Sequence, residues 1–472
     1  MNGINIRFNQ NEANAMKIVM IGAGYVGLTT GACLADLGHE VTCVDLDAER
    51  IEQLKHGETP IFEPGLTALM RKQAAAGRLH FAARPDTAVP LADIVFVTVG
   101  TPAQEDGETD LSYVEAAAAD IALLLRPGAL VVLKSTVPAG TARKLRQLIA
   151  DRRGDDAIGV ASNPEFLREG SAIADFMGAD RIVIGADEDA SRALLERVYE
   201  PLTANGIPLV STSTINAELV KYAANAFLAL KIGFINDVAN LCERAGADVG
   251  DVAFGIGLDK RIGTAFLMPG PGFGGSCFPK DTRSFVQTGR RLAARQHLIE
   301  ELVDKNEARK RELARRIIRE AGDRPAGKTV AILGVAFKGN TDDVRESAAL
   351  TIIPLLQRAG LKVRAHDPKA RAAASEYLED IEWRATAYEA ADRADLTVVL
   401  TDWAEYRDID LHRLSAVMAG QTLVDFRNVF EPAEVIRHGL RYVSLGRPPM
   451  AAANRSARAG FAERVGIAAS PA

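Results

Sequence analysis

The sequence lacks the features that mark proteins acting on nucleic acids or membranes. Its formal net charge is only -6 over 472 residues, and its Lys and Arg residues form no basic run with interleaved aromatics, so nucleic acid is not an expected partner. No apolar run reaches about 18 residues, because Asp120 and Arg126 interrupt the most apolar segment, residues 116–133. Residues 1–15 have no apolar core, so we expect a disordered extension rather than a secretory signal. A membrane is therefore not an expected partner either.

Cysteine is also scarce. The four cysteines, Cys33, Cys43, Cys242 and Cys277, have neither the paired spacing of a metal site nor the density of a disulfide scaffold. We therefore expect no metal site and a reducing, cytoplasmic location. The first three lie among apolar residues of predicted helices or strands and are interpreted as packing residues, which leaves Cys277 for chemistry.

A dinucleotide-binding pattern is present near the start of the chain. A predicted strand at residues 17–21 runs into GAGYVG at residues 22–27, then into a helix to about Leu37 and a second strand ending at Asp45. A strand, a glycine turn, a helix and a second strand, with an acid roughly 20 residues after the turn, form the fingerprint of a Rossmann-type site.

Each residue of this pattern has an expected role. Gly22 permits the tight turn, Gly24 lets backbone N–H groups reach a pyrophosphate, and Gly27 lets the helix approach the strand. Asp45 is expected to accept hydrogen bonds from the adenosine ribose and to disfavour a ribose phosphate. The pattern therefore predicts NAD rather than NADP.

Three further strands are predicted at residues 94–99, 129–133 and 158–161. Each is followed by polar or Gly/Pro-rich sequence, namely TVGTPAQEDGETD, KSTVPAGT and SNPEFLREG. Ligands of open parallel sheets bind beyond the carboxyl ends of the strands, so we expect these loops to line one crevice.

A second copy of the strand, helix and strand pattern begins at Lys328. KTVAILG reads as a strand, residues 348–360 as a helix, and the next strand ends at Asp367. The intervening loop lacks the first glycine spacing and carries Lys338 and Arg345, which suits a diphosphate-bearing ligand. A decayed or purely structural repeat is the alternative.

The central region is predicted to be helical. Residues 216–244 are apolar at helical spacing, and Glu218, Lys221 and Asn225 lie at i, i+3 and i+7 on one face. A long apolar helix usually belongs to a core or a subunit interface, but a buried Lys is rare unless it is paired or used in function.

These patterns predict an α/β chain with two doubly wound Rossmann-like domains joined by a helical central domain with one long helix. The length and the hydrophobic content of 47% agree with more than one core. The predicted boundaries are 1–15 for the extension, 16–211 for the first Rossmann-like domain, 212–321 for the helical domain, 328–446 for the second Rossmann-like domain and 447–472 for a mobile tail.

The segment GFGGSCFPKD, residues 272–281, predicts a reactive thiol. Glycines let the backbone approach a substrate closely, and a thiol needs a neighbouring positive charge or base to react. Lys280 and Asp281 could supply either, and an inert cysteine in a Gly-rich loop is the alternative.

Seven motifs in this order, GAGYVG, TPAQEDGETD, KSTVPAGT, SNPEFLREGSA, ELVKYAANAFLALKI, GFGGSCFPKD and FKGNTDDVRES, resemble the UDP-glucose 6-dehydrogenase family over roughly residues 16–448. The resemblance implies an N-terminal NAD domain, a central dimerisation helix and a C-terminal UDP domain. It also implies oxidation of UDP-glucose to UDP-glucuronate with two NAD, through a cysteine thiohemiacetal and a thioester. The implied partners are UDP-glucose and further copies of the chain, in a homodimer or higher homo-oligomer.

The resemblance also implies roles for individual residues. Cys277 is the implied nucleophile, Lys221 and Asn225 stabilise the oxyanion, and Asp281, Thr136 and Glu165 share the acid, base and hydrolysis work in a division left open. For NAD it implicates Gly22, Gly24, Tyr25, Val26, Gly27, Asp45, Arg50, Thr101, Thr136, Glu169 and Arg345. For UDP-glucose it implicates Glu165, Phe166, Leu167, Arg168, Lys221, Asn225, Arg261, Phe273, Gly274, Phe337, Lys338 and Arg427, of which Arg261 can come from the neighbouring subunit.

The chain departs from the family pattern at Gly233 and Asp237, where Ser and Glu are frequent, and in GADRIVIG, which lacks a proline before DR. These positions lie on a helix surface and at a strand entry, so the expected activity stands. Two alternatives remain open. The first is the same chemistry on GDP-mannose or UDP-N-acetylmannosamine, which GSCFPKD disfavours. The second is a non-catalytic nucleotide-sugar-binding protein, which the intact set of catalytic residues disfavours.

Overall fold

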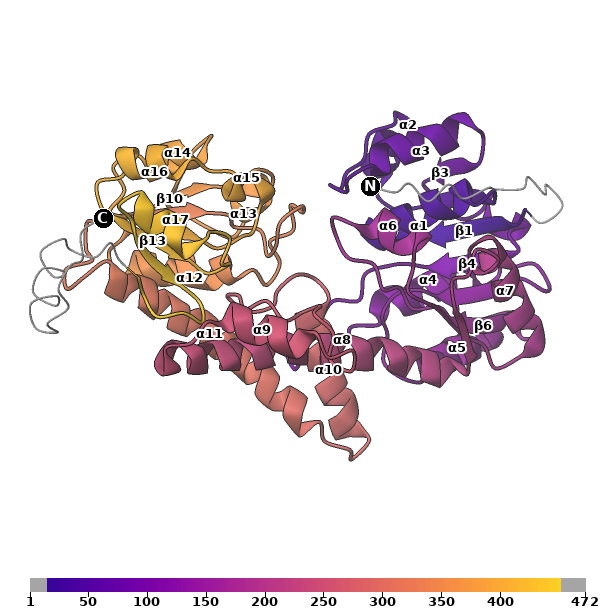
Figure 1. Cartoon of the computed structure of the whole chain (residues 1–472). Helices are drawn as coiled ribbons and strands as arrows, with labels where there is room; N and C mark the ends of the chain where they lie inside the picture. The colour runs from indigo at the N-terminus through magenta and orange to yellow at the C-terminus, as the bar shows by residue number, and fades with distance from the viewer. Residues whose placement is uncertain (1–14, 451–472) are drawn as a thin grey trace, which may run out of the picture. The chain divides into compact units, whose positions relative to one another are not determined.

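The computed structural model describes residues 15–450, which form two compact units (Figure 1). The first unit extends to Phe227 and also contains Cys277–Glu300, while the second contains Leu228–Ser276 and the chain from Glu301 onward. The predicted extension lies outside the described residues except for residue 15, and the predicted tail lies outside them beyond residue 450.

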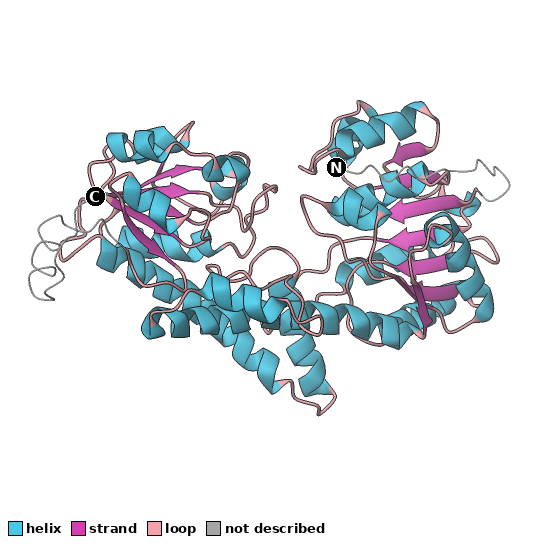
Figure 2. Ribbon diagram, viewed as in Figure 1, coloured by secondary structure: helices cyan, strands magenta, loops and turns pink. Residues whose placement is uncertain are grey.

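The first unit is built on an eight-stranded sheet with the order β3-β2-β1-β4-β5-β6-β7-β8 (Figure 2). Neighbouring strands are parallel except β6 and β7, which meet antiparallel at Ser162 and Gly185. The first six positions have the strand order of a dinucleotide-binding Rossmann fold. The bounds are β1 Lys17–Ile21, β2 Glu40–Val44, β3 Leu79–Ala82, β4 Ile94–Val97, β5 Leu130–Leu133, β6 Gly159–Ser162, β7 Ile182–Gly185 and β8 Leu209–Thr212.

Helices cover both faces of this sheet. Ile18 and Met20 of β1 belong to one buried cluster, and the alternate residues Val19 and Ile21 belong to another. Helices α1, α3 and α7 contribute to the first cluster, and α4 and α5 contribute to the second, which confirms the doubly wound arrangement. The bounds are α1 Tyr25–Asp36, α2 Ala48–Lys55, α3 Leu66–Ala75, the 3-10 helix Val89–Leu91, α4 Ser112–Ala122, α5 Thr141–Arg153, α6 Ala172–Met177 and α7 Asp189–Thr203.

The second unit contains a six-stranded, fully parallel sheet with the order β11-β10-β9-β12-β13-β14. One large buried cluster holds its strands and helices together. The strands are β9 Thr329–Leu333, β10 Lys362–His366, β11 Ile381–Trp383, β12 Leu396–Val399, β13 Thr422–Asp425 and β14 Arg441–Ser444. The helices are α12 Ala348–Arg358, α13 Arg371–Ala374, α14 Ala387–Ala391, α15 Ala404–Arg407, α16 Leu411–Val417 and α17 Pro432–Arg437.

Four helices make up the region between the two sheets in sequence: α8 Thr214–Ala245, α9 Val249–Gly257, α10 Phe278–Arg291 and α11 His297–Glu320. Helix α8 has 32 residues and matches the predicted long helix. Both α8 and α11 cross the division between the units. Within the second unit, α9 packs on the later part of α8 through the buried residues Ile235, Ala239, Val249 and Ala253. None of the helices in residues 15–450 has the length and apolar character to cross a membrane.

Candidate active site

The turn after β1 has the geometry that a dinucleotide requires. Gly22 has a φ of +105°, in the left-handed region that favours glycine, and its N–H donates to Val44 O at 2.8 Å. A Cβ on Gly27 would lie 1.9 Å from Gly22 O, so only glycine fits there. A Cβ added to Gly24 would have no other described atom within 4 Å, apart from those of its chain neighbours and its own helix. The backbone at the start of α1 is therefore accessible to a phosphate.

Asp45 follows β2 beside this turn. Its Oδ2 accepts hydrogen bonds from Ala23 N at 2.8 Å and Arg50 Nη1 at 3.0 Å, and its Oδ1 accepts one from Asp47 N at 3.0 Å. The Asp45 side chain remains 13% exposed, and a carboxylate offers about four lone-pair sites. One acceptor site is therefore available for a ribose hydroxyl, and the residues present fit NAD.

Most of the other residues predicted to bind the cofactor lie at one edge of the first sheet. The strands β1, β4, β5 and β6 are parallel neighbours, so the segments that follow them meet at this edge. These segments carry Tyr25, Val26, Thr101, Thr136 and Glu169. Arg345 belongs to the second unit, where its Nη2 lies 2.7 Å from Asp343 Oδ2.

Helix α8 presents Glu218, Lys221 and Asn225 as buried side chains, so the predicted common face is confirmed. Lys221 Nζ donates to Glu165 Oε1 at 3.0 Å, and Glu165 Oε2 accepts from Leu167 N at 2.6 Å. Burial alone would lower the pKa of Lys221, but the nearby negative charges, above all that of Glu165, outweigh it and raise this pKa. Burial would likewise raise the pKa of Glu165, but the charge and hydrogen bond of Lys221, the N–H of Leu167 and the charge of Lys134 together outweigh it and lower this pKa. The pair is therefore ionised at neutral pH.

Asp281 forms a second buried pair in the same unit. Its Oδ2 accepts from Asn225 Nδ2 at 2.6 Å, and its Oδ1 accepts from Lys280 Nζ at 2.6 Å. Burial would lower the pKa of Lys280, but nearby negative charges, above all that of Asp281, together outweigh it and raise this pKa. Lys280, whose role the sequence left open, is therefore the charge partner of Asp281.

Cys277 lies at the N-terminus of α10, and its carbonyl accepts from Asp281 N at 2.8 Å. The N-terminus of a helix favours an anion, and the charge of Cys277 contributes to the raised pKa of Lys221. Cys277 is partly exposed, whereas Cys33, Cys43 and Cys242 are buried. Burial raises the pKa of both Cys33 and Cys43 to about 12. Among the four cysteines, Cys277 alone combines access with an electropositive surrounding.

Lys134 is a buried residue near this site that the sequence interpretation missed. It directly follows β5, and its Nζ donates to Asn163 Oδ1 at 2.9 Å. Burial lowers the pKa of Lys134 to about 8, against the opposing attraction of Glu165. The only signal in the sequence was a lysine at the end of an apolar strand.

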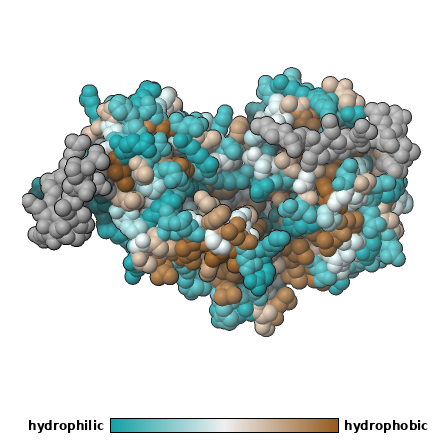
Figure 3. Space-filling view, viewed as in Figure 1, coloured by the Kyte–Doolittle hydropathy of each residue, from teal (hydrophilic) through white to brown (hydrophobic). Residues whose placement is uncertain are grey.

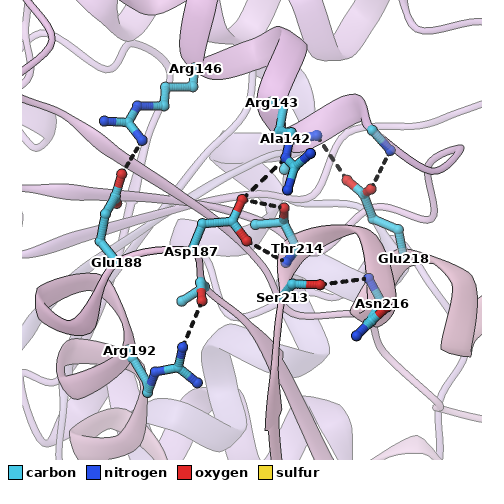
Figure 4. A network of polar contacts seen from close by, with 12 residues as sticks. Ala142, Arg143, Arg146, Asp187, Glu188, Arg192, Ser213, Thr214, Asn216 and Glu218 are labelled. Atoms are coloured by element: carbon cyan, nitrogen blue, oxygen red, sulfur yellow. Dashed lines mark hydrogen bonds and ion pairs between the residues drawn. The ribbon is translucent and has the colours of Figure 1, made fainter.

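Glu218 joins the buried polar face of α8, with Lys221 and Asn225, to the loop that carries Thr136 (Figure 4). Its two carboxylate oxygens accept from Gly140 N at 2.6 Å and from Ala142 N at 2.8 Å, at the start of α5. Burial raises the pKa of Glu218 to about 7, partly offset by these two N–H groups. In the same view, Asp187 bonds to Thr214 at the start of α8. Helix α8 is therefore held at two points against the loops of the first sheet.

The glycines before Cys277 are required by packing inside the second unit. A Cβ on Gly274 would lie 2.5 Å from Glu346 O, and a Cβ on Gly275 would lie 2.7 Å from the ring of Phe337. The sequence interpretation assigned this space to an approaching substrate. Protein atoms occupy it instead.

Phe273, in the same segment, is fixed by the side chain of Asn306. Phe273 N donates to Asn306 Oδ1 at 2.9 Å, and Asn306 Nδ2 donates to Phe273 O at 3.0 Å. A Cβ on Gly272 would lie 2.7 Å from the same Oδ1. The backbone of this segment therefore has a defined position in the second unit.

Three residues predicted to bind the substrate gather near the carboxyl ends of the strands in the second sheet. Arg427 donates from Nε to Leu400 O at 2.8 Å and from Nη2 to Phe337 O. Burial lowers the pKa of Arg427, although Asp402 and Asp425 oppose this shift. Lys338 Nζ lies 5.5 Å from the ring centroid of Phe337.

Two other predicted arginines have partners elsewhere. The Arg261 side chain is 89% exposed and pairs with Asp259 at 2.6 Å. Arg168, in the first unit, pairs with Asp175 at 2.6 Å. The structure therefore brings together the predicted carboxylates, the Asn225 amide and Lys221. The guanidinium groups of Arg168 and Arg261 instead form ion pairs with carboxylates nearby in the sequence.

The turn after β9 repeats the backbone of the first turn with a different environment for its acid. Gly334 has a φ of +88°, and its N–H donates to His366 O at 2.8 Å. The carboxylate of Asp367 accepts from the backbone N–H groups of residues 335, 336, 369 and 370 and from Trp403 Nε1, at 2.7–3.2 Å. These five donors saturate the Asp367 carboxylate.

Three protein-family models match the chain in sequence order. Residues 16–203 match the NAD binding domain of the UDP-glucose/GDP-mannose dehydrogenase family, residues 215–308 match its central domain, and residues 331–432 match its UDP binding domain. The matches cover both glycine turns, helix α8 and the segment around Cys277.

Individual proteins are similar over nearly the same span. A UDP-glucose 6-dehydrogenase of Rhizobium meliloti (strain 1021) is 50% identical over 436 residues, which cover 92% of this chain and 100% of the relative. UDP-glucose 6-dehydrogenase TuaD of Bacillus subtilis (strain 168) is 44% identical over 434 residues, which cover 92% and 93%. The structure of a UDP-glucose dehydrogenase from the hyperthermophilic archaeon Pyrobaculum islandicum matches with a TM-score of 0.84 at 39% identity, covering 89% of this chain and 96% of that chain.

Proposed function

Because the chain belongs to the UDP-glucose/GDP-mannose dehydrogenase family, we propose that it catalyses the NAD-dependent, four-electron oxidation of UDP-glucose to UDP-glucuronate. One observation carries the proposal: an accessible thiol at a helix N-terminus lies in the same unit as two buried, charge-paired carboxylates and a dinucleotide turn. The relatives named UDP-glucose 6-dehydrogenase support the choice of sugar nucleotide.

The thiol of Cys277 holds the substrate carbon between two oxidations. The first oxidation removes a hydride and the hydroxyl proton from the hydroxymethyl group and leaves an aldehyde. The thiolate adds to the aldehyde carbon, and the oxygen takes a proton to form a thiohemiacetal. Loss of a second hydride and of that proton gives a thioester, whose C–S bond breaks when water attacks. When bound, NAD supplies the hydride acceptor for both oxidations.

Lys221 and Asn225 are suited to stabilise the oxyanion that develops at this carbon. An ammonium has three N–H donors and an amide nitrogen has two. Lys221 donates one of its three to Glu165, and Asn225 donates one of its two to Asp281. The remaining N–H groups belong to residues one helical turn apart, and in this proposal both donate to the same oxygen atom of the substrate. Glu165 and Asp281 hold the two donors in place and supply carboxylates that accept protons, with Thr136 positioning the water.

The UDP group is assigned to the second unit. Lys338 and Arg427 lie at the carboxyl ends of its strands, where a lysine at a strand-to-helix turn neutralises a diphosphate. Phe273, Gly274 and Phe337 complete this set, and the fixed backbone of residues 272–275 supports it. The sugar is assigned to the loop of residues 165–168 in the first unit.

We further propose that the protein acts as a cytoplasmic homodimer or larger homo-oligomer. Helix α8 exposes Phe227, Phe234 and Leu241 at intervals of seven residues, which places them on one face. Hydrophobic surface gathers over the helices α8 and α9 in the view of Figure 3, and such a patch marks a protein interface. Arg261 of each copy would then serve the neighbouring site. Phe234→Asp should yield monomers in analytical ultracentrifugation, and dimers in this variant would contradict the assignment.

The product ratio tests the central proposal. With UDP-glucose limiting, we expect two NADH per substrate and UDP-glucuronate as the product. One NADH with free aldehyde would exclude the four-electron mechanism. The same assay with GDP-mannose and UDP-N-acetylmannosamine tests the alternative sugars.

A further inference from the structure

Glu63, a buried carboxylate outside the predicted site, joins two segments of the first unit. It lies in the loop before α3 and is 6% exposed. Its Oε2 accepts from the phenol of Tyr25 and from Gly170 N at 2.6 Å, and its Oε1 accepts from Ala172 N at 2.8 Å. Within residues 15–450 this carboxylate has no cation partner, so hydrogen bonds from neutral donors hold it.

Both joined segments belong to the ligand sites. Tyr25 is the first residue of α1, directly after the turn that fits a dinucleotide. Gly170 lies near the end of the loop that begins after β6 and carries Glu165, and Ala172 is the first residue of α6, which follows that loop. Burial and the hydrogen bond to Glu63 raise the pKa of Tyr25, so the phenol remains a donor at physiological pH.

We propose that Glu63 is a positioning residue that couples cofactor binding at the Tyr25 turn to the placement of the Glu165 loop, an inference that rests on the proposed function. Two carboxylate oxygens carry three hydrogen bonds, so one segment cannot move without straining the bonds to the other. A ligand that fixes the turn then favours one position of the loop. By linkage, a ligand that fixes the loop strengthens cofactor binding by the same factor.

The test compares four variants with the wild-type enzyme. Tyr25→Phe removes only the hydroxyl that donates to Glu63, Glu63→Gln keeps the side-chain shape, and the double variant closes the cycle. Tyr406→Phe is the matched control, because Tyr406 is fully buried and its hydroxyl donates to His366 O at 2.9 Å in the second unit. Calorimetry measures the dissociation constant of NAD alone and with saturating UDP-glucuronate, a pair that cannot turn over.

In the wild-type enzyme we expect UDP-glucuronate to tighten NAD binding about 5- to 20-fold, within the usual range for coupled sites. Tyr25→Phe and Glu63→Gln should each reduce this factor to within about twofold of one, and the double variant should show no further loss. Tyr406→Phe should keep the wild-type factor.

Two results would overturn the proposal: a wild-type factor near one, or an unchanged factor in Tyr25→Phe and Glu63→Gln. A purely structural role for Glu63 predicts the second result together with a lower melting temperature. If Glu63→Gln does not fold, the milder Tyr25→Phe decides. Wild-type enzyme that binds NAD but not UDP-glucuronate contradicts the proposed substrate as well as this coupling, whereas binding of both without coupling contradicts the Glu63 proposal alone.

Discussion

The two glycine turns of this chain begin alike and differ in what their acids contact. In each turn a glycine with positive φ donates to the end of the neighbouring strand, and the next N–H donates to the acid after that strand. Asp45 keeps an exposed edge and meets one cation, Arg50. Asp367 is buried and meets five protein donors.

This difference separates an acid that can still accept a hydrogen bond from a ligand, Asp45, from an acid whose acceptor sites are all used within the protein, Asp367. An acid after the second strand recognises a ribose only when its carboxylate still has a free lone pair, and sequence position does not report that. Asp45 meets the condition and Asp367 does not. The second sheet therefore keeps the backbone of a dinucleotide fold without the free acceptor, and its proposed ligand contacts are Lys338 and Arg427 instead.

The largest expected effect tests whether Cys277 of the first unit is the nucleophile of the proposed reaction. Cys277→Ala should lower turnover by at least about three orders of magnitude, because in the proposed mechanism the nucleophile acts as a unit with its base and oxyanion donors. Binding of NAD and of UDP-glucose, measured by calorimetry, should remain. Cys277→Ser, whose alkoxide leaves less readily than a thiolate, should accumulate an ester detectable by intact-protein mass.

Cys242→Ala is the control for this experiment, because Cys242 is a buried packing residue in the second unit. Its turnover should stay near that of the wild type. Formation of UDP-glucuronate by Cys277→Ala at a near wild-type rate would refute the thioester mechanism.

The next effect compares the two acids directly. Asp367→Asn leaves several buried donors without an acceptor and should lower the free energy of unfolding by about 2–4 kcal/mol, measured by urea denaturation. Asp45→Asn should cost less stability and instead weaken NAD binding by roughly tenfold, near the value of one hydrogen bond to a charged group. Equal losses of unfolding free energy in the two variants would contradict the conclusion that Asp367 is structural and Asp45 is available to a ligand.

A smaller effect tests the ligand assigned to the second unit. Lys338→Ala should weaken UDP-glucose binding by about 1.5–3 kcal/mol, the usual range for a hydrogen bond to a charged group, and leave NAD binding unchanged. Lys362→Ala, which changes an exposed lysine on β10, should alter neither affinity. Unchanged UDP binding in calorimetry of Lys338→Ala would remove Lys338 from the site.

The smallest effect is a pH dependence confined to the first unit. Burial raises the pKa of Glu218 to about 7, above that of a glutamate in the unfolded chain. Protonated Glu218 therefore adds to the free energy of unfolding. This contribution is fully present below the pKa of the unfolded state and is lost as the pH rises through about 7. From about pH 6.5 to 7.5 this loss amounts to about 0.7 kcal/mol. Arg143 and Asp187 face the same segment (Figure 4), and the pKa of Asp187 is lowered, away from this window.

Glu218→Gln should lack this part of the pH dependence. Urea denaturation at several pH values gives the difference in unfolding free energy between the wild type and this variant. A difference that does not change across the window would show that Glu218 does not titrate there.

The sequence predicted the features that depend on local spacing. The roles of Gly22 and Gly27 follow from a six-residue turn, and the shared face of Lys221 and Asn225 follows from the helical period. Both are confirmed. The strands predicted from short, mostly apolar runs also agree with β1, β2, β4, β5, β6, β9 and β10 to within two residues at each end.

The partners of these residues were not predictable from spacing. Glu165 and Lys221 are 56 positions apart, and so are Asn225 and Asp281, so their meeting depends on the order of strands and on the placement of α8. Glu63 lies 107 positions from Gly170 and has no periodic signal at all. The glycines beside Cys277 show a third case. The sequence correctly indicated that the backbone is closely approached there, but the approaching atoms belong to the protein and not to a substrate.

Helix α8 limits how this chain can diverge. Glu218, Lys221 and Asn225 bond within the first unit, and Asn236 accepts from Gly270 N at 2.9 Å within the second. Inserting or deleting one residue between them would rotate one set by about 100° relative to the other. Related genes should therefore keep the length of this segment as strictly as its bonded residues, so that loops gain and lose residues while the spacing from Glu218 to Asn236 is inherited unchanged.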